Sequence, residues 1–368
     1  MKKIEIDTPA LVINRHKMME NLTYMQKYAD ANEVTLRPHT KTHKMPAVAK
    51  LQVEAGAKGI AVAKVGEAEV MAANGLTNIF IANQIVGEQK LLRIQKLAET
   101  INISFGIDSL YHVEEIEKVF ASSEKKAQVL IEIEIGENRS GVIEEKDFIA
   151  ILKRLKTCEH IEYKGIFSHD GHTYSAESLD ACKALYLEGV ERTLGFAAIG
   201  EEMGWENQVV SIGSTPPFML GFGIPKGVTE IRPGTYIFMD LGQGNVLGTY
   251  ERCAASVLTT VISKPTHERV ITDVGAKGIT MQTRKKGITK TEGLGFVKEH
   301  DNVHVHAVYD EHAIIYNEAF RNTIQIGDKI EIIPNHICPV SNLYDKAFIV
   351  EEDEVVDTFS IDGRGKLQ

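Results

Sequence analysis

The chain has 368 residues, of which 43% are hydrophobic and 25% charged, and its formal net charge is -10. This length favours two domains. The acidic balance argues against a general nucleic-acid or anionic-membrane binder, because both need cationic surface. No apolar run approaches the roughly 20 residues of a membrane span, and the charged start MKKIEIDTPALVINRH lacks the apolar core of a signal peptide, so we expect a cytoplasmic protein.

Strand-like and helix-like segments alternate through the first two thirds of the chain. Helical spacing of apolar residues occurs at 45–57, 65–75, 146–155 and 181–204. The strand-like segments, rich in Ile, Val and Phe, are 35–41, 59–63, 78–83, 102–108, 128–135, 163–170, 208–213 and 230–238. Eight alternations with short connections predict an α/β fold, a (β/α)8 TIM-type barrel over residues 12–242.

The pattern of predicted secondary structure changes at about residue 245. The remaining segments read as strands with almost no helix between them, at 253–264, 268–277, 301–316, 324–334 and 346–361. They predict a C-terminal, mostly antiparallel β domain over residues 243–368. The strand-like residues 1–11 precede the first helix, and we expect them to join this domain.

Chemically active side chains follow several barrel strands, at the ends where barrel enzymes place their active sites. They are Lys41 after the first strand, Arg139 after the fifth, and His169, His172 and Tyr174 after the sixth. Arg139 has an alternative interpretation, an ion pair with Glu132 or Glu134 on its own strand.

Gly213, Ser214 and Thr215 follow the seventh strand, where backbone N–H groups and small hydroxyl residues commonly bind phosphate. A lysine facing such a turn suggests a Schiff base with pyridoxal phosphate, and the cations of LRPHTKTHK (36–44) would help to keep the Lys41 amine deprotonated. Binding of a substrate anion by Lys41 is the alternative.

His336 and Cys338 form a second candidate site. If the segment EIIPNHICPV is extended, the two side chains point to the same face. Imidazole and thiolate suit Zn²⁺ or another borderline-soft divalent ion, and two ligands leave positions open for substrate. A buried cysteine beside a partly buried histidine is the alternative.

The chain resembles the D-threonine aldolase and D-serine dehydratase family, whose members have the alanine-racemase-type, fold-type III pyridoxal-phosphate fold. RPHxKTHK together with a late HxC is a specific combination, and the resemblance covers nearly the whole chain. The segments that carry it are DTPALVI (7–13), LRPHTKTHK (36–44), GIAVAKVGEAEVM (59–71), FIANQIVG (80–87), GIFSHDGHTYS (165–175), EIRPGTYIFMD (230–240) and NHICPVSNLYD (335–345).

This resemblance implies a role for each candidate residue. It also implies a homodimer in which the β domain of one subunit completes the other's site. The implied roles are Lys41 (rather than Lys44) as the covalent attachment point, Arg139 and His169 beside the cofactor ring, Gly213, Ser214 and Thr215 on its phosphate, Tyr236 lining the cofactor pocket, His172 and Tyr174 facing the substrate, and His336 and Cys338 holding Zn²⁺ or Mn²⁺.

We therefore expect a lyase that uses pyridoxal 5'-phosphate and a divalent metal to act on β-hydroxy D-amino acids. HxC resembles the dehydratases, whereas the aldolases have HxD, so we expect elimination of water to a 2-oxo acid and ammonia, as with D-serine or D-threonine. Cleavage to glycine and an aldehyde is the alternative, followed by an amino-acid racemase or a non-catalytic cofactor binder. The segment GITMQTRKK (278–286) differs from that of relatives, and we expect substrate contacts there to differ.

Overall fold

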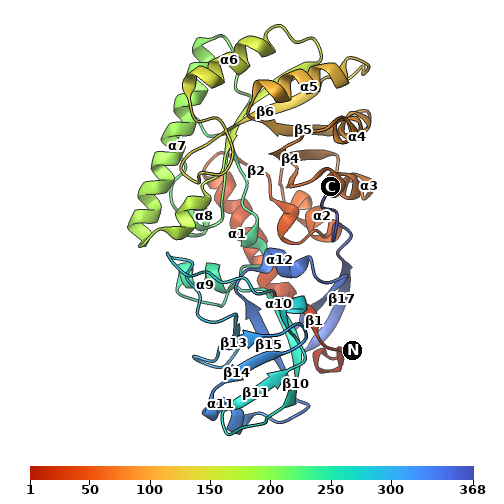
Figure 1. The fold of residues 1–368 in the computed structure, drawn as a ribbon, viewed down its shortest axis with the longest axis vertical. Helices are drawn as coiled ribbons and strands as arrows, with labels where there is room; N and C mark the ends of the chain where they lie inside the picture. The colour runs from red at the N-terminus through yellow and green to blue at the C-terminus, as the bar shows by residue number, and fades with distance from the viewer.

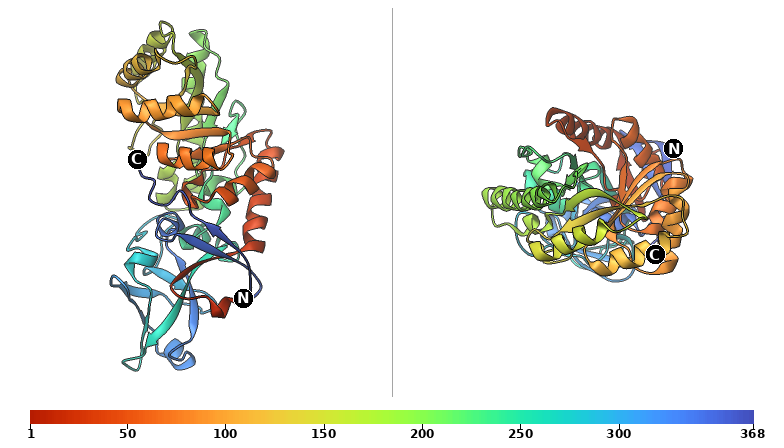
Figure 2. Two further views of the ribbon diagram at one scale, coloured as in Figure 1. Left: turned by 90° about the vertical axis from the view of Figure 1, so that its right-hand side faces the viewer. Right: turned by 90° about the horizontal axis from the view of Figure 1, so that it is seen from above.

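All 368 residues are described by the computed structural model, which has an upper part of helices around a sheet and a lower part built mostly of strands (Figure 1). The molecule is elongated, with the two parts stacked along its long axis (Figure 2). No helix combines the length and the apolar character needed to cross a membrane.

Eight parallel strands form the upper sheet, in the order β2-β9-β8-β7-β6-β5-β4-β3. The sheet curls until its edges meet, because His39 and Ala61 form a parallel bridge and Ala61 N donates to Pro38 O at 2.8 Å. The strands are β2 (Thr35–Leu36), β3 (Ile60–Val62), β4 (Asn78–Gln84), β5 (Asn102–Ile107), β6 (Ala127–Ile133), β7 (Ile161–Ser168), β8 (Val209–Ile212) and β9 (Glu230–Ile231).

The predicted α/β barrel fold is confirmed, but two of its strands are much shorter than expected. β2 and β9 have two residues each, where the sequence predicted strands over 35–41 and 230–238. Pro38 and Pro233 lie two residues beyond the ends of these strands and have no N–H to continue a ladder. The residues that follow are therefore free to form turns, and these turns carry the site.

Helices cover the outside of the curled sheet, as the view along the long axis shows (Figure 2). Most connections are full helices, but β8 and β9 are joined only by the short α8. The helices of this part are α1 (Arg15–Ala31), α2 (Pro46–Glu54), α3 (Val65–Ala73), α4 (Glu88–Ala98), α5 (Leu110–Phe120), α6 (Glu145–Leu155), α7 (Leu179–Glu202) and α8 (Pro216–Met219). The helix α9 (Leu241–Leu247) follows β9 and lies where the two parts meet (Figure 1).

The lower part is a mostly antiparallel sheet with the path β13-β14-β11-β10-β1-β16-β17, and β15 joins β10 to β12. Its strands are β1 (Ala10–Asn14), β10 (Ala255–Ser263), β11 (Arg269–Thr272), β12 (Gly295–Val297), β13 (Val305–Val308), β14 (Ala313–Tyr316), β15 (Lys329–Pro334), β16 (Lys346–Glu351) and β17 (Glu354–Ser360), with short helices α10 (Ala276–Ile279), α11 (Glu318–Thr323) and α12 (Ile337–Ser341). β1 lies between β10 and β16, so the start of the chain joins this sheet, and the boundary expected at residue 12 falls inside a strand.

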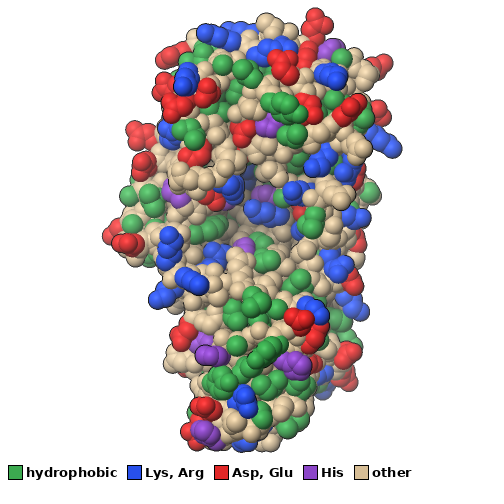
Figure 3. Space-filling view, in the orientation of Figure 1, with side chains coloured by type: hydrophobic (Ala, Val, Ile, Leu, Met, Phe, Trp, Pro, Cys, Tyr) green, Lys and Arg blue, Asp and Glu red, His purple; other side chains and the backbone are tan.

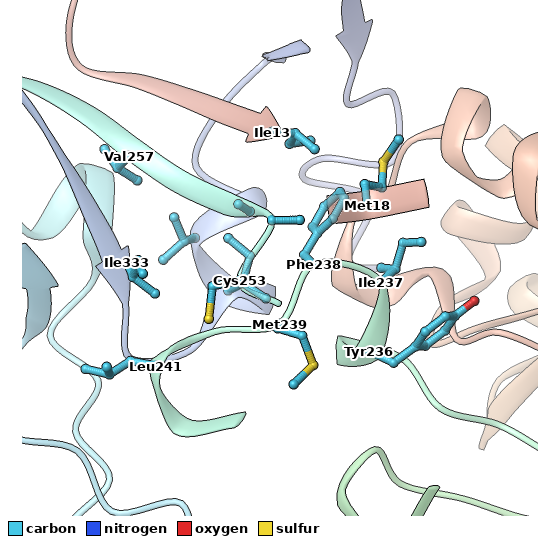
Figure 4. Packing of buried hydrophobic residues seen from close by; sticks show 14 of the residues in the cluster. Ile13, Met18, Tyr236, Ile237, Phe238, Met239, Leu241, Cys253, Val257 and Ile333 are labelled. Atoms are coloured by element: carbon cyan, nitrogen blue, oxygen red, sulfur yellow. The ribbon is translucent and has the colours of Figure 1, made fainter. Parts of the chain in front are cut away.

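One hydrophobic core crosses the junction of the two parts (Figure 4). Ile13 of β1, Val257 of β10 and Ile333 of β15 approach it from the lower sheet. Phe238 and Met239, from the segment that links β9 to α9, are completely buried against them. Because the junction is packed like an interior, the turns of the upper part face the loops of the lower part in a fixed arrangement.

Candidate functional site

A hollow opens on the face of the molecule at the junction of the two parts, with Lys, Arg and His side chains gathered around it (Figure 3). The turns after the barrel strands face it from above, and the loops around α12 face it from below.

Lys41 lies on a single 3-10 turn, Thr40–Thr42, directly after β2. Thr40 Oγ1 donates to Ala61 O at 3.1 Å, which holds the turn against β3. Burial lowers the pKa of the Lys41 amine; the nearby Cys338 opposes this effect, and Arg139 adds to it. A neutral amine is the form that can act as a nucleophile or a base.

The turn after β8 offers unused hydrogen-bond donors. The backbone N–H groups of Gly213 and Ser214 donate to no group in the chain, and the buried hydroxyl of Thr215 has no partner. The Ser214 hydroxyl, by contrast, donates to Asp170 Oδ2 at 2.9 Å. A Cβ at Gly213 would stand 3.0 Å from the backbone of Arg232, so the close approach of the next strand favours glycine here.

His169 joins this turn to the Lys41 region. Its Nδ1 is 2.6 Å from Gly213 O and therefore donates to it, which leaves Nε2 without a proton in the neutral ring. Burial lowers its pKa well below the usual value, and the positive charges of Lys41 and Arg139 lower it further. A neutral, flat ring thus lies against the turn after β8 and within reach of the charge of Lys41.

Arg139 is half exposed and pairs with two carboxylates. Its Nη2 lies 3.7 Å from Glu132 Oε1, and its Nη1 lies 3.4 Å from Glu137 Oε2. The pairing with Glu132 is the alternative that the sequence left open, and Glu134 takes no part in it. Arg139 still acts on the site by charge, because it contributes to the lowered pKa of Lys41 and of His169.

His172 and Tyr174 lie on the 3-10 turn Gly171–Ser175 after β7. A Cβ on Gly136 would be 3.2 Å from the His172 ring, whose Nδ1 is buried without a partner. Burial raises the pKa of Tyr174, while Arg284 and a hydrogen bond from the Thr215 backbone act in the opposite direction. Tyr174 therefore lies against the turn after β8. Its contact with substrate, which the resemblance implies, stays a prediction.

Tyr236 and Lys44 lie in packed surroundings. Tyr236 is completely buried, and its hydroxyl accepts from Gln52 Nε2 at 2.9 Å. Lys44 pairs with Glu67 at 3.0 Å and donates to Asn342 Oδ1 at 3.0 Å. These contacts suit Lys44 to a structural role that joins the two parts.

Sequence reasoning missed Arg232, which lies directly after β9. Arg232 is 5% exposed. Its guanidinium donates to Ser211 Oγ at 2.5 Å and to Ser168 O at 2.7 Å. The same group stands over the rings of Phe80 and Phe167. Burial lowers its pKa to about 10. An arginine at the end of a barrel strand, in EIRPGTY, was the available signal.

His336 and Cys338 converge, although the reason given from the sequence was wrong. β15 ends at Pro334, so the segment is not extended; His336 caps α12 and Cys338 lies in its first turn. His336 Nδ1 is 2.9 Å from Asp240 Oδ2, and the two are suited to a hydrogen bond from the ring to the carboxylate. Cys338 Sγ is 3.2 Å from Thr42 Oγ1, beside Lys41.

The electrostatics of this pair favour a thiolate. Burial would raise the pKa of Cys338, but His336, the Thr42 hydroxyl and the charge of Lys41 hold it at about 7. Burial would also lower the pKa of His336, and Cys338 and Asp240 raise it to about 9. Thr235 Oγ1, 3.6 Å from the sulfur, is a further hydroxyl beside it.

Both groups that the resemblance implies fit these residues. The free N–H groups of Gly213 and Ser214 and the orphaned Thr215 hydroxyl suit a phosphate, and Lys41 supplies an amine for an aldehyde. His336 and Cys338 offer nitrogen and sulfur donors. No group of three or more His, Cys, Asp or Glu side chains is arranged to hold a metal, so an ion here would need water or substrate to complete its ligands.

Comparisons with known proteins agree with this arrangement. The model of the alanine racemase N-terminal domain matches residues 13–242, and that of a putative serine dehydratase domain matches residues 254–350. D-threonine aldolase of Arthrobacter sp. is 29% identical over 98% of this chain and 93% of its own. D-threo-3-hydroxyaspartate dehydratase of Delftia sp. (strain HT23) is 30% identical over 91% of this chain and 92% of its own.

Solved structures of the same two kinds of enzyme also resemble this chain. D-threonine aldolase from Filomicrobium marinum superimposes with a TM-score of 0.91 at 27% identity, covering 99% of this chain and 98% of its own. A cysteine-to-alanine variant of a D-threo-3-hydroxyaspartate dehydratase, in the metal-free form, has a TM-score of 0.90 at 28% identity and covers 98% of both chains. A histidine-to-alanine variant of that dehydratase, changed two positions earlier, has a TM-score of 0.92 at 28% identity, covering 98% of this chain and 96% of its own. The chain therefore belongs to the alanine-racemase-type family that includes the D-threonine aldolases and D-serine dehydratases.

Proposed function

We propose that this protein is a lyase that uses pyridoxal phosphate and a divalent metal to eliminate water from β-hydroxy D-amino acids, giving a 2-oxo acid and ammonia. One observation carries the proposal: Cys338 Sγ lies 3.2 Å from Thr42 Oγ1, so the HxC pair of the lower part adjoins the turn that bears Lys41. The α-carbon and the β-hydroxyl of one small amino acid can therefore each face a reactive group.

Pyridoxal phosphate, bound through Lys41 and the Gly213–Thr215 turn with Arg139 and His169 nearby, would supply an electron sink for the α-carbon. Lys41 Nζ is the group we assign to removal of the α-proton. Its lowered pKa suits this task, because the amine is then unprotonated in a larger fraction of molecules. The buried guanidinium of Arg232 adds a positive charge close to His169.

A divalent ion held by His336 and Cys338, Zn²⁺ or Mn²⁺, would supply Lewis-acid chemistry at the β-hydroxyl. Asp240 fixes the orientation of the His336 ring, because Nδ1 donates to its carboxylate and Nε2 is left to bind metal. The metal-free structure of the dehydratase variant that lacks a cysteine supports the assignment of this pair. The cysteine and the histidine replaced in the two dehydratase variants are two positions apart in the sequence, as His336 and Cys338 are in this chain.

Cleavage of the Cα–Cβ bond to glycine and an aldehyde is the second candidate reaction. It needs a base for the β-hydroxyl proton, and the buried His172 Nδ1 has no partner in the chain. Relatives named as aldolases support this alternative. A racemase or a non-catalytic cofactor binder would not need His336 and Cys338.

We also propose that the protein acts in the cytoplasm as a homodimer with shared sites. The family resemblance supports the dimer. Light scattering of the purified protein measures the dimer: twice the mass of one 40.8 kDa chain is expected, and a monomer would contradict it.

The cofactor and the reaction are tested with one preparation. Purified protein with pyridoxal phosphate should develop the visible absorption of a Schiff base, and Lys41→Ala should lack it, whereas the exposed Lys50→Ala should retain it. With Zn²⁺ or Mn²⁺ and D-serine or D-threonine, a 2-oxo acid is expected. Acetaldehyde from D-threonine would establish the aldolase instead, and no absorption band in the wild type would refute the cofactor assignment.

A further inference from the structure

Asp170 carries a buried carboxyl group at the site that the proposed function does not use. It lies between His169 and the 3-10 turn Gly171–Ser175, and it is 4% exposed. Its Oδ2 is 2.9 Å from the Ser214 hydroxyl, and its Oδ1 is buried without a hydrogen-bond partner. One hydrogen bond thus serves a group that has about four acceptor positions when it is ionised.

Asp240 shows what an ionised carboxylate requires at a similar depth in this chain. It is completely buried and accepts three hydrogen bonds, one of them from His336. Burial acts to raise its pKa, but the hydrogen bond and the charge of His336 keep that pKa below the usual value. Burial also acts on the pKa of Asp170, and there the hydrogen bond from Ser214 does not offset it, so the pKa of Asp170 is raised. The two carboxyl groups are almost equally buried, and the number of donors around them differs.

The hydrogen bond to Ser214 places Asp170 at the turn that we assign to the cofactor phosphate. The N–H groups of Gly213 and Ser214 and the hydroxyl of Thr215 have no partners in this turn. A phosphate monoester carries about 1.5 to 2 negative charges at neutral pH. An ionised Asp170 would lie one hydroxyl group away from this charge, and a nearby like charge disfavours the ionised form of a carboxyl.

The direction of the hydrogen bond between Asp170 and Ser214 decides what the turn offers to a phosphate. If Asp170 is ionised, the Ser214 hydroxyl must donate to it, and only oxygen lone pairs remain for other contacts. If Asp170 is protonated, its O–H can donate to Ser214 Oγ, and the Ser214 proton is then free for the phosphate. The distance of 2.9 Å suits both directions.

The surroundings of Asp170 favour a neutral carboxyl. Arg232 is the permanent cation that acts on it, but the Arg232 Nη1 and Nη2 groups donate to Ser211 Oγ and Ser168 O instead. A buried carboxyl without a paired cation commonly takes up a proton rather than keep its charge. The other ionisable groups that act on Asp170, or on which it acts, include no permanent cation: His172 and Tyr174 on the turn after β7, Glu137 on the loop after β6, and Cys182 and Tyr186 of α7.

We propose that Asp170 is a positioning residue: as a neutral carboxylic acid it donates to Ser214 Oγ and thereby directs the Ser214 hydroxyl proton toward the cofactor phosphate. This inference rests on the cofactor assignment of the proposed function, and it holds for elimination and for cleavage of the Cα–Cβ bond alike. The backbone N–H groups of the turn and its two hydroxyls then all donate, and the carboxyl beside them adds no negative charge.

Infrared spectra of protein labelled with ¹³C at its aspartate carboxyl groups test the protonation state at neutral pH. The cofactor-loaded wild type should show the C=O stretch of a protonated aspartic acid, and Asp170→Asn should lack it. Labelling of aspartate alone excludes Glu137, because burial raises the pKa of that carboxyl as well. The exposed Asp357→Asn, on β17, is the matched control and should keep the band. Absence of the band from the loaded wild type, or its persistence in Asp170→Asn, would overturn the proposal.

Binding of pyridoxine 5'-phosphate and of pyridoxine, measured by calorimetry at neutral pH, provides a second readout without turnover. Asp170→Asn should bind pyridoxine 5'-phosphate no more weakly than the wild type, because the amide N–H can donate to Ser214 Oγ as the carboxyl O–H does. Ser214→Ala should weaken this binding by about 10-fold or more, the scale of one hydrogen bond to a charged group, and should change pyridoxine binding by no more than about twofold. A loss of about 10-fold in Asp170→Asn, confined to the phosphate-bearing ligand, would contradict the assignment, because an ionised carboxylate would then be required.

Failure of this inference differs from failure of the proposed function. If pyridoxal phosphate gives no Schiff-base absorption and pyridoxine 5'-phosphate does not bind, the cofactor assignment is wrong, and the role of Asp170 is wrong with it. If the cofactor binds and the acid band is missing, the role of Asp170 alone is wrong.

Discussion

The Asp240 carboxylate shows how single residues prepare the site. It is completely buried and accepts three hydrogen bonds: from His336 Nδ1 at 2.9 Å, from Ile337 N at 3.1 Å and from Gln243 N at 2.9 Å. Burial would raise the pKa of Asp240, but His336 and the charge of Arg284 keep it below its usual value. One ionised carboxylate therefore joins the start of α9 to the start of α12 and fixes the His336 ring.

Replacement of this carboxylate should weaken metal binding without changing the ligands. Asp240→Asn keeps the shape but removes the charge that holds the Nδ1 proton, so metal affinity should fall by about 10- to 100-fold. Competition titration with a chelator measures it. The exposed Asp345→Asn, in the segment after α12, is the control. Unchanged affinity in Asp240→Asn would show that Asp240 does not orient a metal ligand.

At the scale of elements, β15 carries a largely buried carboxylate, Glu331, that joins it to β10, to the end of β12 and to the start of the chain. Glu331 accepts from Lys3 Nζ at 2.8 Å, from Lys298 Nζ at 2.9 Å and from Ser256 Oγ at 2.6 Å. Burial would raise its pKa from the usual 4.5, but these partners lower it to about 2. The ionised form is therefore bound more strongly by the folded chain than by the unfolded one.

Glu331 should make stability depend on acidity over a defined range. A carboxyl whose folded pKa is depressed contributes its full stabilisation above about pH 4.5 and loses it as the pH falls through about 2. The contribution at neutral pH is about 3 kcal/mol. Urea unfolding at a series of pH values should show the gap between wild type and Glu331→Gln shrinking over this range. The exposed Glu352→Gln is the control, and a gap independent of pH would contradict the account.

Sequence periodicity was sufficient to locate the eight barrel strands, because most of them are apolar runs bounded by turn residues. It failed where backbone donors decide the structure: proline shortened β2 and β9, and α12 begins where an extended HxC segment was expected. Lys41, His169 and the 213–215 turn were predicted as site residues because strand ends mark a barrel's active site. Arg232 was not predicted as a site residue, since its burial and its partners distant in the sequence do not appear in the periodicity.

At the scale of the whole molecule, the site exists only because the two parts share one core. Phe238 and Met239 are completely buried between the barrel and the lower sheet (Figure 4), and Gly363 N donates to Lys44 O at 3.0 Å, close to the Lys41 turn. The Lys41 turn and α12 are thereby held in contact. In the proposed function, the chemistry at the α-carbon belongs to the upper part, and the chemistry at the β-carbon belongs to the lower part.

This division can be measured directly in Cys338→Ala loaded with pyridoxal phosphate, with D-serine in D₂O. The account predicts that Lys41 still exchanges the α-proton of D-serine for deuterium, seen by NMR, while pyruvate formation falls by at least about 100-fold because the Lewis acid is lost. Pyruvate formation at the wild-type rate would contradict the account, since the reaction would then not need the metal pair beside Lys41.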